Sequence, residues 1–238
     1  MNIFWDEIIE PIFLEENVKS IIEIGSESGI NTTRILEYCS KSNARLISID
    51  PAPLFEAEKY EKEHELLQII QDISLNAFPY IGDYDAVLID GDHNWYTVYH
   101  ELKLIEKNAL QQGKFPIVFL HDTDWPYGRR DMYYFPDTIP EQFRKEYAKK
   151  GMLQGQSELI EPDSKFDKES INKSLNNALY EGGEKNGVLT AIEDFLSQSS
   201  LPLSFYNNTA NHGLGIICNK NERLEGFIED KEGFTRIK

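Results

Sequence analysis

The sequence predicts an α/β fold, with a doubly wound, Rossmann-like sheet of about seven strands. Short apolar runs alternate with stretches of helical periodicity over most of the chain, which is typical of parallel strands joined by helices. Residues 84–89, Tyr-Asp-Ala-Val-Leu-Ile, predict a strand buried on both faces. This run ends in Asp90-Gly91-Asp92-His93, and ligands of such sheets bind beyond the carboxyl ends of the strands. We therefore expect a reaction centre there rather than a solvated turn.

The predicted elements follow one another from residue 5 onward. An imperfect apolar stripe predicts a helix over 5–19, with Pro11 as a candidate break. Strands are expected at 21–24, 46–49, 66–70, 84–89, 116–120, 203–206 and 213–218. Helices are expected at 31–40, 54–65, 94–108 and 187–197. The polar residues 219–238 are expected to fray.

Regular alternation stops after residue 121. Residues 123–186 are rich in Pro, Gly, Asp, Lys and aromatic residues, with one short helix expected near 140–149. A stretch this long without regular elements is usually functional or disordered. Its aromatic side chains favour an ordered lid over a mobile tail. The sequence thus predicts a single domain, residues 1–238, with a substrate-binding lid inserted at about 123–186.

Composition narrows the classes of partner. The formal net charge of −17 over 238 residues disfavours nucleic acid and anionic membranes as partners. We find no apolar run long enough to span a bilayer, and no basic start of a signal peptide. Cys39 and Cys218 make no disulfide framework and are expected to be reduced core residues. We expect a cytoplasmic protein with a small-molecule substrate, and the sequence leaves open whether it forms a homo-oligomer.

The first candidate site is the turn Glu23-Ile-Gly25-Ser26-Glu27-Ser-Gly29. Glycines where a strand turns into a helix let a ligand approach the backbone. A dinucleotide fold would place its middle glycine at Glu27, whose carboxylate would repel a diphosphate. S-adenosylmethionine carries a sulfonium and no phosphate, so it suits this turn better. An ordinary turn without a ligand is the alternative.

Two more acids follow the next predicted strands. Asp50 lies about 20 residues beyond the glycines, where an acid accepts hydrogen bonds from ribose hydroxyls. Asp72 follows the third strand, where it could accept from an adenine amine. Each alone is more often a strand-end or helix-capping residue. Together with Glu23, their positions at successive strand ends favour a shared nucleoside pocket.

The set Glu23-x-Gly25-x-x-x-Gly29, Asp50, Asp72 and Asp90-Gly-Asp-His93 resembles the class I S-adenosylmethionine-dependent methyltransferases. The resemblance covers about residues 18–122 and 187–219. It is similar above all to the branch of metal-dependent sugar O-methyltransferases, such as those acting on macrolide and aminocoumarin sugars. The resemblance implies that Glu23, Gly25, Ser26, Gly29, Asp50, Asp72 and Asp90 bind S-adenosylmethionine.

In that branch, an Asp at the end of the fourth strand and an acidic pair at the end of the fifth hold a divalent metal. A residue just after the fourth-strand Asp serves as base. By position, the resemblance implies Asp90, His121 and Asp122 as metal ligands, and His93, beside Asp92, as the base. His121 departs from the pattern, because such relatives carry an acid there.

The chemistry of these side chains agrees with that implication. A divalent metal lowers the pKa of a bound water from about 16 to about 7, and it can likewise acidify a sugar hydroxyl. A neutral His93 can then take the proton near physiological pH. Carboxylates with one imidazole suit Mg²⁺, Mn²⁺ or Fe²⁺, and the imidazole favours the last two. The alternative is that His93 merely begins a helix and His121 is a satisfied core histidine.

Residues that follow the metal candidates are predicted to bind the substrate. Arg129 and Arg130 form a basic pair whose guanidinium groups match phosphate oxygens, while flanking aromatic rings can stack on a sugar or base. Salt bridges from this pair to Asp124, Asp131 or Asp137 are the alternative. The predicted substrate-binding residues are Trp125, Tyr127, Arg129, Arg130, Tyr133 and Asn186.

The predicted function is methyl transfer from S-adenosylmethionine to a sugar hydroxyl, assisted by a divalent metal. The substrate would be a nucleotide-activated or phosphorylated sugar, in a surface-polysaccharide pathway. A non-catalytic relative could retain the cofactor pocket without turnover, but the intact set of Asp90, His93 and Asp122 argues against it. A binding module for nucleotide sugars would need the arginine pair but no metal. A nicotinamide-dependent oxidoreductase would use the same sheet, yet the missing middle glycine counts against it.

Overall fold

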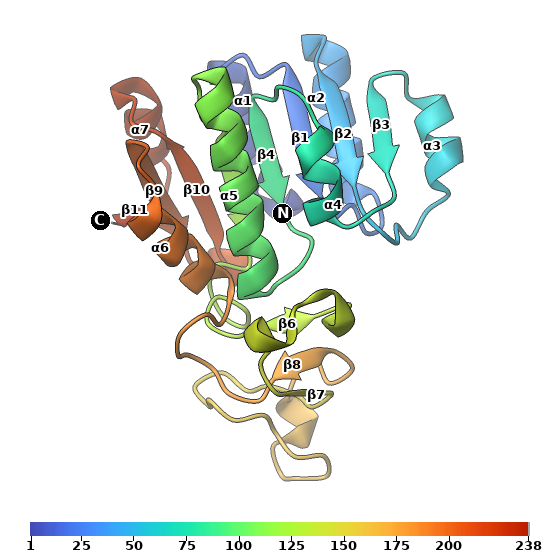
Figure 1. Cartoon of the computed structure of the whole chain (residues 1–238), viewed down its shortest axis with the longest axis vertical. Coiled ribbons are helices and arrows are strands. Elements are labelled where there is room, and N and C mark those ends of the chain that lie inside the picture. The colour runs from blue at the N-terminus through green and yellow to red at the C-terminus, as the bar shows by residue number, and fades with distance from the viewer. Residues whose placement is uncertain (238) are drawn as a thin grey trace.

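The computed structural model describes residues 1–237, which are arranged around an eight-stranded sheet (Figure 1). The strand order is β11-β9-β10-β5-β4-β1-β2-β3. The strands are β1 (Ser20–Ile24), β2 (Arg45–Ile49), β3 (Leu67–Ile70), β4 (Ala86–Ile89), β5 (Ile117–His121), β9 (Leu203–Asn208), β10 (Leu214–Asn219) and β11 (Phe234–Ile237). Strands β1 to β5 are parallel, whereas β9, β10 and β11 pair antiparallel with their neighbours. The predicted α/β class is confirmed.

The central strands are apolar on both faces because helices cover both. Ile21, Leu88 and Phe119 belong to one buried cluster, whereas their chain neighbours Ile22 and Val87 belong to another. Successive side chains of a strand point to opposite faces, so each strand reads as a continuous apolar run. This explains why residues 84–89 could be recognised as a doubly buried strand.

Helices α1 (Glu10–Glu15), α2 (Ile30–Ser42) and α7 (Glu222–Glu229) supply the first cluster, and α4 (Ser74–Ala77), α5 (Trp95–Gln112) and α6 (Val188–Gln198) supply the second. Figure 1 shows α5 and α6 in front of the sheet, with α3 (Ala57–Glu63) at the edge beside β3. The helix expected over 5–19 is shorter, since a π-helix at Trp5–Ile9 precedes α1 and the helix ends at Glu15. Pro11 lies in the first turn of α1, where proline is tolerated.

The lid, residues 123–186, lies beyond the carboxyl ends of the parallel strands (Figure 1). It contains a small antiparallel sheet in the order β6-β8-β7, formed by β6 (Met132–Tyr133), β7 (Tyr147–Ala148) and β8 (Asn176–Ala178). The helix expected near 140–149 is wrong: only a 3₁₀ turn forms, at Glu141–Phe143. Tyr147 and Ala148 instead pair with β8, so their backbone groups belong to a sheet.

The expectation that residues 219–238 fray is also wrong for the part of the chain that the structure describes. Helix α7 buries Leu224 and Ile228 against the sheet, and β11 adds an eighth strand beside β9. The apolar residues of this segment are few, but they recur at helical spacing. The many polar residues around them hid this pattern in the sequence. None of the helices within residues 1–237 is long and apolar enough to cross a bilayer.

Candidate functional site

A cleft of about 620 Å³ opens at the carboxyl ends of β1, β2, β4 and β5. Its walls come from the turns that follow these strands and from the near side of the lid. The residues that line it include Gly25, Ser26, Glu27, Asp50, Asp90, Asp92, His93, His121, Asp122, Tyr134 and Phe135. Residues predicted separately at four strand ends therefore share one cavity, as the topology of such sheets requires.

The turn after β1 is built on a close approach to the turn after β4. Gly25 has φ +86°, and a Cβ added there would lie 2.4 Å from the carbonyl oxygen of Asp90. Only glycine fits this position, on conformational and on steric grounds. Gly29 is also left-handed, with φ +79°, and precedes α2 directly. The glycines thus bring the Ser26 and Glu27 backbone to the cleft, next to Asp90.

Asp50 holds this turn in place. Its Oδ2 accepts the backbone N–H groups of Ser26 and Glu27 at 2.8 and 2.9 Å, and its Oδ1 accepts the N–H of Ala52 at 2.8 Å. Asp50 also lines the cleft, where it was expected to meet a ribose. Most of its acceptor capacity is used within the turn, so Oδ1 is the atom with a lone pair left for a ligand.

Glu23 and Asp72 are not among the residues that line the cleft, and their contact with the cofactor stays a prediction. The Glu23 carboxylate accepts from Asn31 Nδ2, Thr32 Oγ1 and Ser48 Oγ, and so fastens α2 to β2. Burial raises the pKa of Glu23 to about 7. Asp72 accepts from the backbone N–H of Ile73 and from Asn76 Nδ2, next to the start of α4. Glu23 therefore supports the cleft from within the core, whereas Asp72 is exposed.

The tips of β4 and β5 bring two carboxylates and two imidazoles together. His93 Nε2 lies 3.1 Å from Asp122 Oδ2 and 3.7 Å from Asp90 Oδ1. His121 Nδ1 lies 3.0 Å from Asp122 Oδ2 and 3.2 Å from Asp90 Oδ1. Asp90, His93 and Asp122 each offer an atom within 4.8 Å of the others, a spacing that could hold a metal ion. We name these four residues the strand-tip cluster.

The His93 ring makes no hydrogen bond of its own within the strand-tip cluster. Within residues 1–237, both ring nitrogens of His93 are buried without a hydrogen-bond partner. Such orphaned groups are rare in folded proteins and often indicate a missing ion or water. Tyr127 stacks on the His93 ring, with centroids 5.4 Å apart, and so limits its rotation. Asp122 has φ +57°, a strained conformation of the kind that collects at functional sites.

Charge in the strand-tip cluster is strongly coupled. Burial raises the pKa of Asp90, but the nearby imidazoles of His121 and His93 outweigh it and hold the pKa well below its ordinary value. Burial lowers the pKa of His121, yet hydrogen bonds to Asp122 and Asp90 raise it to about 9. The Met1 α-amino group lies 2.9 Å from Asp90 Oδ2. Protonated groups therefore balance the carboxylates when no other cation is bound, and a metal would displace protons from them.

Asp92 lines the cleft next to the base candidate. Its Oδ2 accepts from Thr97 Oγ1 at 2.9 Å, and its Oδ1 has no partner within the described residues. Burial raises the pKa of Asp92. Asp92 is therefore placed to hold the first turn of α5, on which the His93 backbone depends.

Neither arginine is among the residues that line the cleft, and their assignment to the substrate stays a prediction. Arg129 forms a two-pronged ion pair with Glu193 of α6 at 2.5 and 2.7 Å, and lines a different hollow, of about 900 Å³, beside Trp95 and Phe143. Arg130 is completely buried, and donates to the carbonyls of Ala178 and Ser157. Arg129 does form a salt bridge, as the alternative expectation had it. Its partner, however, is Glu193, which lies 64 residues away, so the spacing along the sequence could not identify it.

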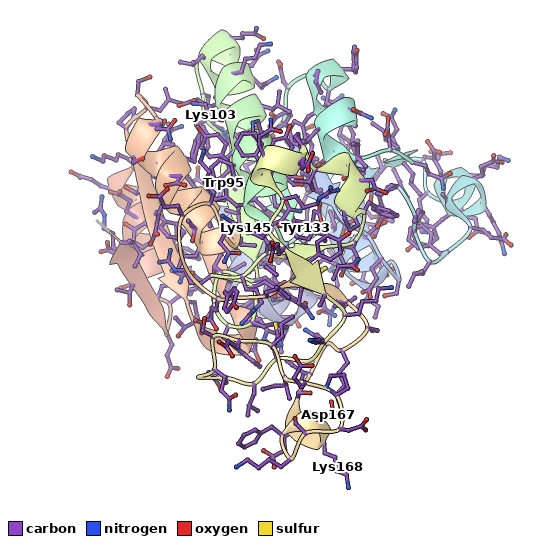
Figure 2. All side chains as sticks on the ribbon, turned by 60° about the horizontal axis from the view of Figure 1, so that its bottom comes forward. Trp95, Lys103, Tyr133, Lys145, Asp167 and Lys168 are labelled. Carbon is purple, nitrogen blue, oxygen red and sulfur yellow. The ribbon has the colours of Figure 1, made fainter. Side chains whose placement is uncertain are left out.

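Three further predicted substrate residues also act inside the lid. The Tyr133 hydroxyl donates to Asp131 Oδ2, and Asn186 Oδ1 accepts the Asp131 backbone N–H. Trp125 packs on the small apolar cluster of the lid that contains Tyr127. Figure 2 shows Tyr133 with Trp95 and Lys145 where the lid meets α5, away from the far tip marked by Asp167 and Lys168.

The lid residues that do line the cleft were missed. They are Tyr134, Phe135, Thr138 and Ile139. Tyr134 is 49% exposed, and its ring centroid lies 6.0 Å from that of His93. No periodic signal could have separated Tyr134 from its neighbour, because β6 ends at Tyr133 and both of its residues are buried.

Comparisons with known proteins agree with this arrangement. Residues 22–123 match the family model described as a methyltransferase domain. The methyltransferase PaMTH1 of Podospora anserina, solved with S-adenosylhomocysteine, has 14% identity and a TM-score of 0.51, over 89% of this chain and 76% of its own. A protein of Nostoc punctiforme, provisionally assigned as an O-methyltransferase, has 15% identity and a TM-score of 0.51, over 89% of this chain and 54% of its own. A search of curated sequences finds no match.

These similarities show the fold, and residues 22–123 are similar to a methyltransferase domain. The matched residues 22–123 include the last three residues of β1, strands β2 to β5, the glycine turn and the whole strand-tip cluster. At 14–15% identity the solved structures establish the architecture, and the family model adds the sequence pattern. The class I methyltransferase fold is therefore shown, and the activity is taken up below as a proposal.

Proposed function

Given a chain with the class I methyltransferase fold and a methyltransferase domain at residues 22–123, we propose that it transfers a methyl group from S-adenosylmethionine to a sugar hydroxyl, with the help of a divalent metal. The proposed acceptor belongs to surface-polysaccharide synthesis in the cytoplasm. The observation that carries the proposal is the shared cleft: the glycine turn held by Asp50 and the strand-tip cluster line the same cavity. A methyl donor and a cation could therefore meet there.

The residues present fit a divalent metal. Asp90 and Asp122 offer ionised oxygens, and His121 offers an imidazole nitrogen, all buried or half-buried and directed at one another. The two buried ring nitrogens of His93, which have no hydrogen-bond partner within residues 1–237, support the binding of a cation or water in this part of the cleft. When bound, such a metal would supply Lewis acidity toward the acceptor hydroxyl.

In this proposal the chain itself contributes three effects. His93 takes the acceptor proton, and Asp122, 3.1 Å from Nε2, orients the ring and stabilises its protonated form. The turn at Gly25 positions the sulfonium group of the methyl donor against Asp90. This turn offers no group that would favour a phosphate-containing ligand instead. The lid excludes water from one side of the cleft, which keeps oxygen, methyl carbon and sulfur aligned for in-line displacement.

A sugar acceptor is supported by the lid wall. Tyr134 and Phe135 expose aromatic faces beside His93, and aromatic faces stack on the apolar faces of sugar rings. Because Arg129 and Arg130 are committed elsewhere, a nucleotide-linked or phosphorylated acceptor would have to bind its phosphates without this pair. Free and nucleotide-linked sugars are therefore both included in the test.

The test incubates the protein with trideuteromethyl S-adenosylmethionine, Mn²⁺ or Mg²⁺ and a panel of free and nucleotide-linked sugars. Mass spectrometry should find one acceptor that gains a trideuteromethyl group, with equimolar S-adenosylhomocysteine. Phenolic acceptors such as catechols form the comparison set. Transfer to phenols but to no sugar would contradict the proposed acceptor class while leaving methyl transfer in place. Glu27, which borders the cleft, predicts that NAD does not bind.

A further inference from the structure

Building on the proposed function, we infer that His121 is a nitrogen ligand and makes the strand-tip cluster select a transition ion, Mn²⁺ or Fe²⁺, over Mg²⁺. The inference concerns which ion the chain chooses. It is carried by the spacing of the donor atoms, by the hydrogen bond on the far side of the His121 ring, and by the kinds of donor present.

The spacing matches a shared ion. His121 Nδ1 lies 3.0 and 3.2 Å from Asp122 Oδ2 and Asp90 Oδ1. Metal–ligand bonds of about 2.0–2.2 Å place neighbouring donors about 3 Å apart around one ion. The three atoms are thus separated as ligands on one face of a coordination sphere would be.

The surroundings of the His121 ring determine which of its two nitrogens carries the proton and which keeps a lone pair for a metal. Its Nε2 lies 3.1 Å from the backbone carbonyl oxygen of Asn211, and a carbonyl can only accept, so Nε2 carries the proton. In the neutral ring Nδ1 then presents its lone pair to the two carboxylates. A carbonyl behind a metal-binding histidine is the usual way in which a protein sets tautomer and ring orientation.

Asn211 is itself held firmly. It lies in the 3₁₀ turn Ala210–His212 with φ +50°, and the His212 carbonyl accepts the Asp124 backbone N–H at 2.8 Å. A Cβ at Gly213 would lie 2.4 Å from Thr123 Oγ1, so this turn is packed tightly on the end of β5. The acceptor for His121 is therefore provided by backbone that cannot easily move.

The donor set decides the selectivity. Mg²⁺ prefers an octahedral shell of oxygens, whereas Mn²⁺ and Fe²⁺ accept imidazole readily. Two carboxylates and a neutral imidazole also balance a divalent charge, since they carry two negative charges in total. An acid at position 121 would restore the all-oxygen site that Mg²⁺ favours.

The experiment measures metal binding rather than turnover. Chelator-treated protein is titrated with MnCl₂ and with MgCl₂ by calorimetry, and pulsed EPR of the Mn²⁺ complex records ¹⁴N coupling. We expect Mn²⁺ to bind at least about tenfold more tightly than Mg²⁺, and His121→Asp to reduce that ratio by about tenfold. The ¹⁴N coupling should disappear in His121→Ala and persist in His93→Ala. His212→Ala is the matched control. His212 also borders the cleft, but its Nδ1 contacts the carbonyl oxygen of Trp125, and within residues 1–237 it makes no hydrogen bond to the carboxylates of the cluster.

Each outcome bears on the inference. Coupling that survives in His121→Ala and vanishes in His93→Ala would overturn it by making His93 the nitrogen ligand. An unchanged Mn²⁺/Mg²⁺ ratio in His121→Asp would also overturn it, without touching the proposed methyl transfer. Failure of every ion to bind would overturn both this inference and the metal assistance proposed above. Binding of S-adenosylhomocysteine by each variant verifies folding, and His121→Asn is a second variant if His121→Ala does not fold.

Discussion

Asp131 in the lid accepts the backbone N–H of Trp95, the first residue of α5, with Oδ1 at 2.7 Å. The same oxygen accepts the N–H of Gly187 at 2.7 Å, just before α6. One buried carboxylate therefore joins the lid to the starts of two helices. The adjacent Met132 donates its N–H to the carbonyl of His93, so the lid is also bonded to the backbone of the proposed base.

Replacing Asp131 by alanine should lower the free energy of unfolding by about 2–4 kcal/mol, because it leaves two buried N–H groups without acceptors. Urea unfolding measures this change. Lys168→Ala, at the exposed far tip of the lid (Figure 2), is the control and should change stability by less than about 0.5 kcal/mol. Similar values for the two variants would show that Asp131 does not anchor the lid.

Gly25→Ala should abolish binding of S-adenosylhomocysteine or prevent folding. The new Cβ would meet the Asp90 carbonyl oxygen at 2.4 Å, and φ +86° is strained for alanine. Gly82→Ala is the matched control, since nothing lies within 4 Å of its Cβ position. Calorimetry with S-adenosylhomocysteine, together with circular dichroism, distinguishes the two variants. Normal affinity in Gly25→Ala would contradict the close packing of the two turns.

The buried Glu101 on α5 predicts a pH dependence of stability. Burial raises its pKa to about 8 from an ordinary value of 4.5, against an opposing hydrogen bond from Ser74. The folded state therefore holds the proton more tightly than the unfolded state does, and the free energy of unfolding falls as pH rises from about 4.5 to about 8. Glu101→Gln has no proton to lose.

Urea unfolding at pH 5, 7 and 9 tests this sign. The wild-type chain should lose stability over the range, and Glu101→Gln should lose less, so that their difference grows with pH. Glu23, whose pKa is about 7, is present in both and cancels in the difference. Parallel curves for the two proteins would exclude Glu101 as a source of the pH dependence.

The two arginines should behave differently on substitution. Arg130→Met leaves the carbonyls of Ala178 and Ser157 without their buried donor, and should cost about 2–4 kcal/mol of stability. Arg129→Ala removes a half-exposed ion pair with Glu193, and should cost about 1 kcal/mol or less. Neither should raise the KM for the acceptor directly. A large rise in KM for Arg129→Ala, with stability unchanged, would restore the phosphate-binding role first expected for it.

The sequence was sufficient for the sheet and for the residues at its strand ends. Strands buried on both faces, such as 84–89, can be recognised in the sequence as continuous apolar runs. Because the strands are parallel, the residues that follow them, Asp90, His93, His121 and Asp122, must lie at the same edge of the sheet. The grouping of these four residues could therefore be foreseen. Their roles remain predictions, because spacing along the chain does not determine which atom faces which.

The lid could not be read in the same way. Its structure depends on long-range contacts between residues far apart in sequence, such as Arg129 with Glu193 and Arg130 with Ser157, which leave no periodic signal. An adjacent arginine pair in an acidic chain looks like an anion site, yet both side chains are used to build the lid. Tyr134, which does face the cleft, was overlooked because its neighbours Tyr133 and Phe135 are also aromatic, so residue type alone did not single it out.

The central claim is that the strand-tip cluster holds a cation that activates an acceptor hydroxyl for methylation in the same cleft. The most direct test is transfer of a trideuteromethyl group to a sugar by the wild-type protein, measured by mass spectrometry before EDTA, after EDTA and after re-addition of Mn²⁺. We predict that transfer stops with EDTA and returns with Mn²⁺, and that His93→Ala lowers kcat by about 10²- to 10⁴-fold at an unchanged affinity for S-adenosylhomocysteine. Transfer that continues unchanged in EDTA would contradict the account.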